Sequence, residues 1–206
     1  LFPYTTLFRS PYSSSDLAVL EGQPGLSVGC DNFRGGCDAT AHLLGLGRRN
    51  IAFLGAASNH CPEFLERYRG YSQALVDAGL EASPALQVDA ITMESSGYAA
   101  ARELIARGER FDAIFAASDL IAIGALRALA EARVDVPGAV SVVGFDDIPA
   151  ASLANPPLTT VLQDTRLAGE ALVETLLHSI RGEPVGHRML PARLVVRRSC
   201  GAVSAG

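Results

Sequence analysis

The sequence predicts an α/β protein built on a doubly wound, mainly parallel sheet. Short runs of β type alternate with longer helical patterns along most of the chain, as in repeated βα units. The run 140–143 (VSVV) is mostly apolar and stops at Gly144, which is typical of a strand buried on both faces. Asp146 and Asp147 follow it. Charge at the carboxyl end of a buried strand indicates a ligand-binding edge of an open α/β sheet.

The strands are predicted from short apolar runs bounded by glycine, proline or charge. In chain order they lie near residues 17–20, 26–30, 51–55, 85–89, 112–117, 140–144 and 159–162, with a last extended stretch near 188–196.

Helical periodicity and capping residues predict the helices between these strands. The first covers 34–46, with Asp31 or Asn32 as its N-cap and Gly47 at its end. The second covers 63–78, where the aromatic residues fall on one stripe. The others, with their predicted N-caps, are 95–106 (Ser95 or Ser96), 119–132 (Ser118) and 165–180 (Thr165).

The composition excludes several classes of protein. With 206 residues, 49% hydrophobic and 19% charged, the chain is an ordinary globular sequence, and its apolar runs stop well short of the ~18 residues of a membrane span. The formal net charge of −5 disfavours contact with nucleic acid by this segment, because phosphate binding needs clustered lysine and arginine. Its four cysteines, at positions 30, 37, 61 and 200, lack metal-ligand spacing and disulfide density. We therefore expect free thiols, no metal, no cofactor and a cytoplasmic protein.

The first ten residues fit none of these patterns. LFPYTTLFRS is the translation of a widely used sequencing adapter, so we expect residues 1–10 to be an artefact and leave them out of fold reasoning. The alternative is a genuine flexible leader.

Polar residues follow several of the predicted strands. The carboxyl ends of parallel strands open on one crevice, so residues there converge although they are distant in sequence. These positions are Asp31 and Asn32, residues 55–67, residues 89–92, Ser118 and Asp119, and Asp146 and Asp147. Their carboxylates, amides, hydroxyls and one guanidinium suit a neutral polyhydroxylated ligand such as a sugar or nucleoside.

Four segments carry a resemblance to a known family. They are 118–125 (SDLIAIGA), 140–147 (VSVVGFDD), 155–161 (NPPLTTV) and 194–199 (LVVRRS). Over residues 17–201 the chain resembles the effector-binding core of the lactose-repressor and galactose-repressor family of bacterial transcription regulators. The resemblance implies a periplasmic-binding-protein-like fold of type I, in which two doubly wound lobes are joined by three crossing segments.

This resemblance also implies a division of the chain. Residues 31–163 and 188–201 would form the C-terminal lobe, and residues 11–30 and 164–187 would be a remnant of the N-terminal lobe. We expect most of that lobe and the family's DNA-binding domain to be missing. The family further implies a homodimer that contacts operator DNA only through the missing domain, and no membrane.

The resemblance implies ligand roles for Asp146 and Arg67, each with a structural alternative. Asp146 is the first acid after the Val-Gly-Phe strand end and would bind the effector, or else form the turn, which is the role we assign to Asp147. Arg67 lies in an Arg-x-x-Gly-aromatic segment and would point into the crevice. Its alternatives are a solvated side chain or an ion pair with Glu63 or Glu66.

Three further ligand contacts are implied. Ser118 would bind the effector, cap its helix, or both, whereas capping is the simpler interpretation for Asp119. Gln163 matches a glutamine that reaches the ligand from a hinge, with a hinge hydrogen bond to the backbone as its alternative. Thr92 stands where several relatives stack an aromatic ring on the effector, so the ligand stays unnamed. Arg69 is assigned to the surface.

Motifs for common catalytic machinery are absent from the sequence, which has no G-x-S-x-G elbow, phosphate loop or H-E-x-x-H pair. We therefore interpret the chain as the effector-sensing, dimerising part of a transcription regulator and not as an enzyme. The alternative is a periplasmic sugar-binding protein of a transporter, with an enzyme on a doubly wound fold in third place. Because Asp146 and Arg67 are expected at the edge of the crevice, truncating either should weaken effector binding with little effect on the fold.

Overall fold

The computed structural model describes residues 28–58 and 60–202. The predicted strand 17–20, the start of the strand 26–30 and residues 1–10 lie outside the described residues. In chain order the elements are β1 (Val28–Cys30), α1 (Asn32–Gly45), β2 (Ile51–Leu54), α2 (Pro62–Asp77), a 3₁₀ turn (Pro84–Leu86), β3 (Gln87–Val88), α3 (Glu94–Ala106), β4 (Ala113–Ala116), α4 (Asp119–Glu131), β5 (Ser141–Asp146), α5 (Pro149–Leu153), β6 (Thr159–Leu162), α6 (Thr165–Ile180), β7 (Arg188–Leu190) and β8 (Arg193–Val195).

The main sheet has the strand order β3-β2-β4-β5-β6-β8. Its neighbouring strands are parallel except for the antiparallel pair β6 and β8. The chain runs outward from β2 to β3, crosses back to β4, and continues in the opposite direction through β5 to β6. The predicted fold class, α/β with a doubly wound parallel sheet, is confirmed, and the strand order reverses between β2 and β4.

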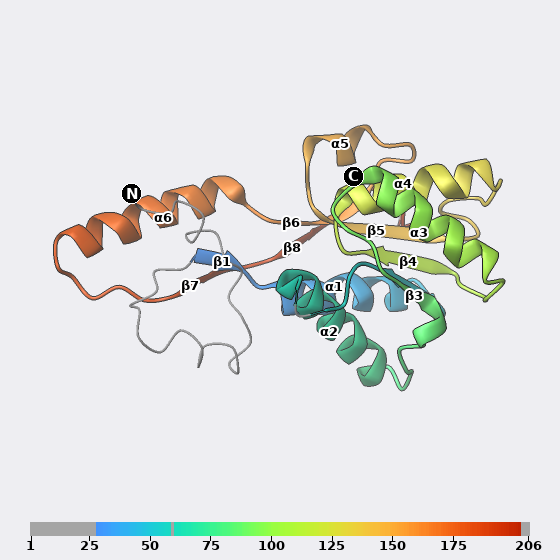
Figure 1. Cartoon of the computed structure of the whole chain (residues 1–206), viewed down its shortest axis with the longest axis horizontal. Helices are drawn as coiled ribbons and strands as arrows, with labels where there is room; N and C mark the ends of the chain where they lie inside the picture. The colour runs from blue at the N-terminus through green and yellow to red at the C-terminus, as the bar shows by residue number, and fades with distance from the viewer. Residues whose placement is uncertain (1–27, 59, 203–206) are drawn as a thin grey trace.

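Two helix pairs cover the main sheet, with α1 and α2 on one face and α3 and α4 on the other (Figure 1). Glycines bring each pair into backbone contact. A Cβ on Gly70 would lie 2.1 Å from the carbonyl oxygen of Phe33, and one on Gly124 would lie 2.1 Å from that of Glu94. Since no side chain fits in these spaces, glycine is what permits the close approach of each pair.

A smaller part of the structure stands apart from the main sheet. Strands β1 and β7 pair in a two-stranded parallel sheet, and α6 lies beside them at one end of the molecule (Figure 1). Val28, Ala168, Ala171 and Leu190 form a separate small core there. The chain passes between the two parts between β1 and α1, between β6 and α6, and between β7 and β8 (Figure 1).

Several predicted details were wrong. Helix α6 begins after Asp164, whose carboxylate accepts from the Leu167 N–H at 2.9 Å, so Thr165 is not the N-cap. Helix α3 begins after Met93 without a side-chain cap, and the Ser96 hydroxyl instead accepts from a loop N–H. The stretch 188–196 is two strands in different sheets, separated at Pro191, which has no N–H to continue a ladder. Helix α5 is too short to show a periodicity and was not predicted.

Across residues 28–58 and 60–202, none of the helices combines the length and apolar character that crossing a membrane requires.

The glycine contact between α1 and α2 makes a stability prediction. Gly70→Ala should destabilise the chain by about 1–3 kcal/mol or more, because the new methyl group meets backbone that can move only with its helix. Gly169→Ala on α6 is the matched control, since a Cβ there meets nothing within 4 Å. It should be neutral or stabilise by up to about 1 kcal/mol. Urea unfolding of both variants checks this, and equal free energies of unfolding would contradict it.

Candidate functional site

The candidate site lies at the carboxyl edge of the main sheet, where the strand order reverses. Open α/β sheets bind ligands at this kind of position. Residues from α1, α2, the end of β5 and the segments that follow β4 and β6 meet there. The structure thus brings together Asn32, Arg67, Asp146 and Gln163, which were predicted to converge on separate grounds.

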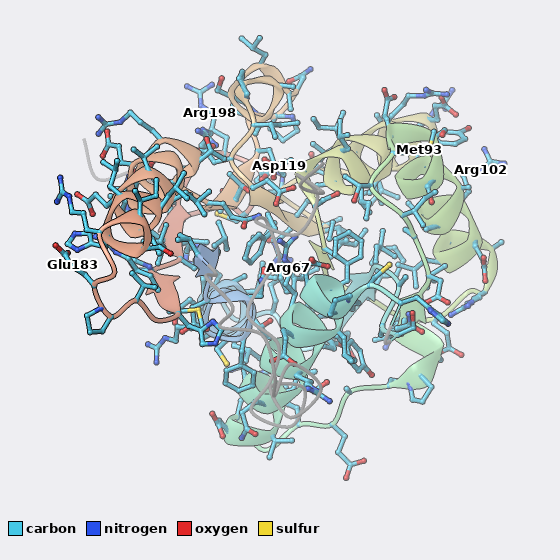
Figure 2. The ribbon with its side chains drawn as sticks, turned by 60° about the vertical axis from the view of Figure 1, so that its left-hand side comes forward. Arg67, Met93, Arg102, Asp119, Glu183 and Arg198 are labelled. Atoms are coloured by element: carbon cyan, nitrogen blue, oxygen red, sulfur yellow. The ribbon has the colours of Figure 1, made fainter. Side chains whose placement is uncertain are left out.

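Arg67 connects most of these segments. Its residue surface is 3% exposed. Its Nε donates to Asn32 Oδ1 at 2.8 Å, its Nη1 donates to the carbonyl oxygen of Ala117, and its guanidinium carbon lies 3.7 Å from the centre of the Phe145 ring. Figure 2 shows Arg67 in the interior of the molecule. Burial lowers the pKa of this guanidinium, and the charge of Asp146 opposes that effect.

The expectation that Arg67 lies at an open edge is therefore wrong. Neither a solvated side chain nor a pair with Glu63 or Glu66 describes it, since its ion-pair partner is Asp146 at 3.4 Å. Glu66 instead pairs with Arg69 at 2.5 Å, and Arg69 lies on the surface as predicted. The reason is helix phase, since Arg67 faces the sheet and Arg69 is two residues further round α2.

Asp146 ends β5 and carries the exposed charge of the site. Its side chain is 24% exposed, and its Oδ1 accepts from Gln163 Nε2 at 2.6 Å as well as facing Arg67 Nη1. Burial raises the pKa of this carboxyl, while Arg67 and Gln163 act in the opposite direction. Asp146 has a φ of 115°, which side-chain-bearing residues rarely adopt. Backbone strain of this kind concentrates at functional sites.

The next residue has the structural role assigned to it. Asp147 has a φ of 56°, as a turn residue does, and its Oδ1 forms an ion pair with Arg197 Nη2 at 2.7 Å. Arg197 also donates to the carbonyl oxygen of Leu158. The two acids at the end of β5 therefore have different partners, since Asp146 faces Arg67 and Gln163 whereas Asp147 is paired with Arg197.

Asp119 fixes the turn after β5 through hydrogen bonds, a role that its position in the sequence did not reveal. Its fully buried carboxylate accepts from Thr160 Oγ1 at 2.5 Å and from the Ile148 N–H at 2.9 Å. A Cβ on Gly144 would lie 2.3 Å from Asp119 Oδ1, so glycine in β5 leaves the room that this carboxylate occupies. Burial raises the pKa of Asp119 to about 7, against the lowering effect of its two hydrogen bonds. Only the partner groups, distant in sequence, identify this role.

The remaining predicted residues lie less centrally. Ser118 is buried and caps α4, accepting from the Ile121 N–H at 3.4 Å, so the structural alternative for it is present. Thr92 is exposed on the loop between β3 and α3, and the contacts of the Arg67 and Asp146 cluster do not include it. Gln163 contacts Asp146 through its side chain, and its N–H donates to the Asp146 carbonyl oxygen at 3.4 Å.

The site mainly offers acceptors for hydrogen bonds from a ligand. Asp146 offers carboxylate oxygen to hydroxyl groups, and Gln163 supplies an amide beside it. A cavity of about 320 Å³ lies elsewhere, between α6 and residues 184–188. In the described part of the chain, no three histidine, cysteine or acidic side chains are grouped so that they could hold a metal ion.

Asp119 makes stability depend on pH. Its pKa is raised from 3.8 to about 7 in the folded chain, so the folded state binds more protons than the unfolded state between these values. The free energy of unfolding should therefore fall as pH rises from about 4 to about 7, by at most about 1.4 kcal/mol per pH unit from this group. Asp119→Asn stays neutral and can keep both contacts, accepting from Ile148 and donating to Thr160. Urea unfolding at several pH values should show a flatter profile for this variant, and parallel profiles would refute the assignment.

Removing the buried guanidinium should be costly. Arg67→Ala leaves Asn32, Ala117 and Asp146 without their partner and opens a space beside Phe145, so a loss of about 3–5 kcal/mol is expected. Arg69→Ala, on the same helix but on its surface, should cost under about 0.5 kcal/mol. Equal melting temperatures for the two variants would contradict the buried role of Arg67.

Comparison with known proteins places these features in a family. The family of periplasmic binding protein-like domains matches residues 40–200. The HTH-type transcriptional regulator CelR of Thermobifida fusca is 40% identical over 191 residues, which cover 91% of this chain and 55% of the relative. The ribose operon repressor of Escherichia coli K12 is 33% identical over 170 residues, covering 82% and 51%. The chain spans about half the length of these curated relatives.

Solved structures agree with this result. A complex of the regulator CelR with cellobiose has a TM-score of 0.80 at 40% identity, covering 86% of this chain and 56% of that one. A transcriptional regulator of the LacI family from Sanguibacter keddieii has a TM-score of 0.82 at 38% identity, covering 87% of this chain and 70% of that one. The resemblance found in the sequence is confirmed, and the chain belongs to the LacI/GalR family of regulators, with the fold of a periplasmic-binding-protein-like effector-binding domain.

Proposed function

We propose that this chain is the effector-sensing part of a DNA-binding transcription regulator and that its effector is a sugar or a similarly polyhydroxylated small molecule. The observation that carries the proposal is the Asp146 carboxylate, which is held by Arg67 and Gln163 on a strained backbone yet stays partly exposed. A fixed carboxylate of this kind accepts hydrogen bonds from a pair of ligand hydroxyls. The family supports a sugar, since the relative CelR forms a complex with cellobiose.

The effector contacts follow from the same geometry. Asp146 is the main acceptor and Gln163 flanks it. Nε and Nη1 of Arg67 donate to acceptors within the protein. We therefore propose that Nη2 is the group that faces the effector. Ser118 and Thr92 complete the proposed set at the ends of β4 and β3, where Thr92 is exposed and Ser118 is buried.

We propose that β1, α6 and β7 belong to a second lobe, opposite a lobe that holds the main sheet. The sequence assigned residues 11–30 and 164–187 to this second lobe and residues 31–163 and 188–201 to the other. Because β7 pairs with β1, we place residues 188–190 in the second lobe as well. The separate small core supports this division. So do the exposed apolar side chains on α6, at Val173, Leu176, Leu177 and Ile180. An effector that binds one arrangement of the two lobes better than another would shift their equilibrium, and equal affinity would shift nothing.

In this proposal the protein is a cytoplasmic homodimer, and the shift changes the operator affinity of the DNA-binding domain that the family implies. An exposed Leu153, at 84%, is compatible with a protein contact on α5. The regulators among the relatives favour this function over a transporter's sugar-binding protein or an enzyme.

Calorimetric titration of the protein expressed from its complete gene, with cellobiose, ribose and a nucleoside, tests the site. Asp146→Ala should bind the effector about tenfold to hundredfold more weakly, because ligand hydroxyls lose their charged acceptor. Arg69→Ala is the surface control and should bind as the unmodified protein does. Tight binding by Asp146→Ala would remove the site assignment, and heat from none of the three ligand classes would count against the proposed effector.

A further inference from the structure

A second cluster of reactive side chains lies away from the candidate effector site. Cys200 follows β8, and its sulfur is 3.3 Å from His42 Nε2 of α1 and 3.1 Å from Thr159 Oγ1 of β6. Thr159 begins β6, whereas Gln163 of the effector site follows the end of that strand. The cluster thus belongs to the opposite edge of the main sheet.

The hydroxyl of Thr159 is oriented toward the sulfur. Its oxygen accepts from the Arg197 N–H at 2.8 Å, so its single hydrogen is free to point at Cys200 Sγ. A hydroxyl donor and an imidazole on one sulfur stabilise a thiolate better than a thiol. The competing acceptor for the thiol proton, the Arg197 carbonyl oxygen, is farther from the sulfur at 3.7 Å.

The other cysteines provide an internal contrast. Burial raises the pKa of the Cys200 thiol. Hydrogen bonds from His42, Thr159 and the Ala202 backbone, together with the charge of His42, act in the opposite direction, and the pKa lies below its ordinary value. Burial raises the pKa of Cys30 to about 11 and also raises the pKa of Cys37. At neutral pH the thiolate character of the chain therefore concentrates on Cys200 among these three residues.

The burial of the Cys200 sulfur limits which oxidants can reach it. Cys200 is 1% exposed, which excludes bulky and charged electrophiles. Its neighbours reach the solvent, since His42 is half-buried and the following Gly201 is exposed. A small neutral molecule such as hydrogen peroxide suits this position, and the imidazole is placed to exchange a proton with solvent.

We propose that Cys200 is a modification site for hydrogen peroxide, with His42 as its proton acceptor and Thr159 as the donor to its thiolate. The thiol proton passes to His42 Nε2, and the sulfur lone pair attacks one peroxide oxygen. The oxygen–oxygen bond breaks, sulfur is oxidised by two electrons to a sulfenic acid, and the leaving hydroxide takes the proton back from His42 as water. The added oxygen displaces the contacts that join α1 and β6 through this sulfur.

The proposal is tested by peroxide treatment of the folded chain, removal of the peroxide, denaturation in the presence of dimedone so that this bulky reagent reaches any sulfenic acid, and quantification of tryptic peptides. Cys30, Cys37 and Cys200 fall on separate peptides because an arginine lies between each pair. Labelling at Cys200 should be at least about tenfold faster than at Cys30 or Cys37 at pH 7, as a lower thiol pKa requires. The rate at Cys200 should rise with pH around a midpoint below the ~8.5 of a free thiol. Equal rates, or a midpoint at or above that value, would overturn the proposal.

His42→Asn separates the proton acceptor from a merely structural partner. It should slow labelling at Cys200 about fivefold or more and move the pH midpoint upward, while His178→Asn on α6 leaves both unchanged. An unchanged rate of labelling at Cys200 in His42→Asn would show that the imidazole is not the proton acceptor. If labelling at Cys30 and Cys37 becomes faster in His42→Asn, the variant has unfolded. The pH midpoint of labelling at Cys200 in the unmodified chain then decides whether the proposal holds.

Discussion

The buried guanidinium of Arg67 is the interaction on which the arrangement of the sheet edge depends. A charged group taken out of water is costly unless every donor is paired. Arg67 meets this condition at Nε and Nη1, which face an amide oxygen from α1, a carbonyl oxygen after β4 and the carboxylate at the end of β5, while its flat face stacks on Phe145. Its Nη2 is the donor that we propose to face the effector. The ends of these elements are thereby fixed relative to one another, and Asp146 is fixed with them.

The close crossing of α1 and α2 makes this pairing possible. A Cβ on Gly36 would lie 2.3 Å from the carbonyl oxygen of Arg67 itself, and one on Gly35 would lie 2.7 Å from the Phe145 ring. Side chains at these two positions would move α2 and the ring on which the guanidinium stacks. The glycines of α1 therefore determine the position of the Arg67 backbone, and the same helix carries Asn32, whose side chain accepts from Arg67.

The sequence predicted the elements that local patterns encode and missed those that depend on long-range partners. Alternating β-type and helical runs were enough to find every main-sheet strand from β2 through β6. The sequence drew attention to Asp146 as an acid after a strand that stops at Gly144, but that strand end was wrong, because β5 continues through Gly144 and ends at Asp146 itself. Burial of Arg67 could not be read from α2, because its helix also carries exposed arginine at position 69 and acidic neighbours. The hydrogen bonds of Asp119 to Thr160 and Ile148 were not predicted, because a serine-aspartate pair at the start of a helix is explained equally well by capping. Its partners, Thr160 and the Ile148 N–H, are 41 and 29 residues away.

The strained turn at the end of β5 connects these contacts to the proposed effector site. Two successive non-glycine residues with positive φ cost on the order of 1–3 kcal/mol each, so the conformation persists only if its surroundings determine it. Asp119 holds the backbone at Ile148, Arg197 holds the Asp147 carboxylate, and Gln163 holds Asp146. A carboxylate that is already fixed loses little conformational freedom when a ligand arrives, which favours affinity without any additional contact. The same rigidity means that a hydroxyl placed only slightly differently meets a misaligned acceptor, so discrimination between ligands can come from the turn itself.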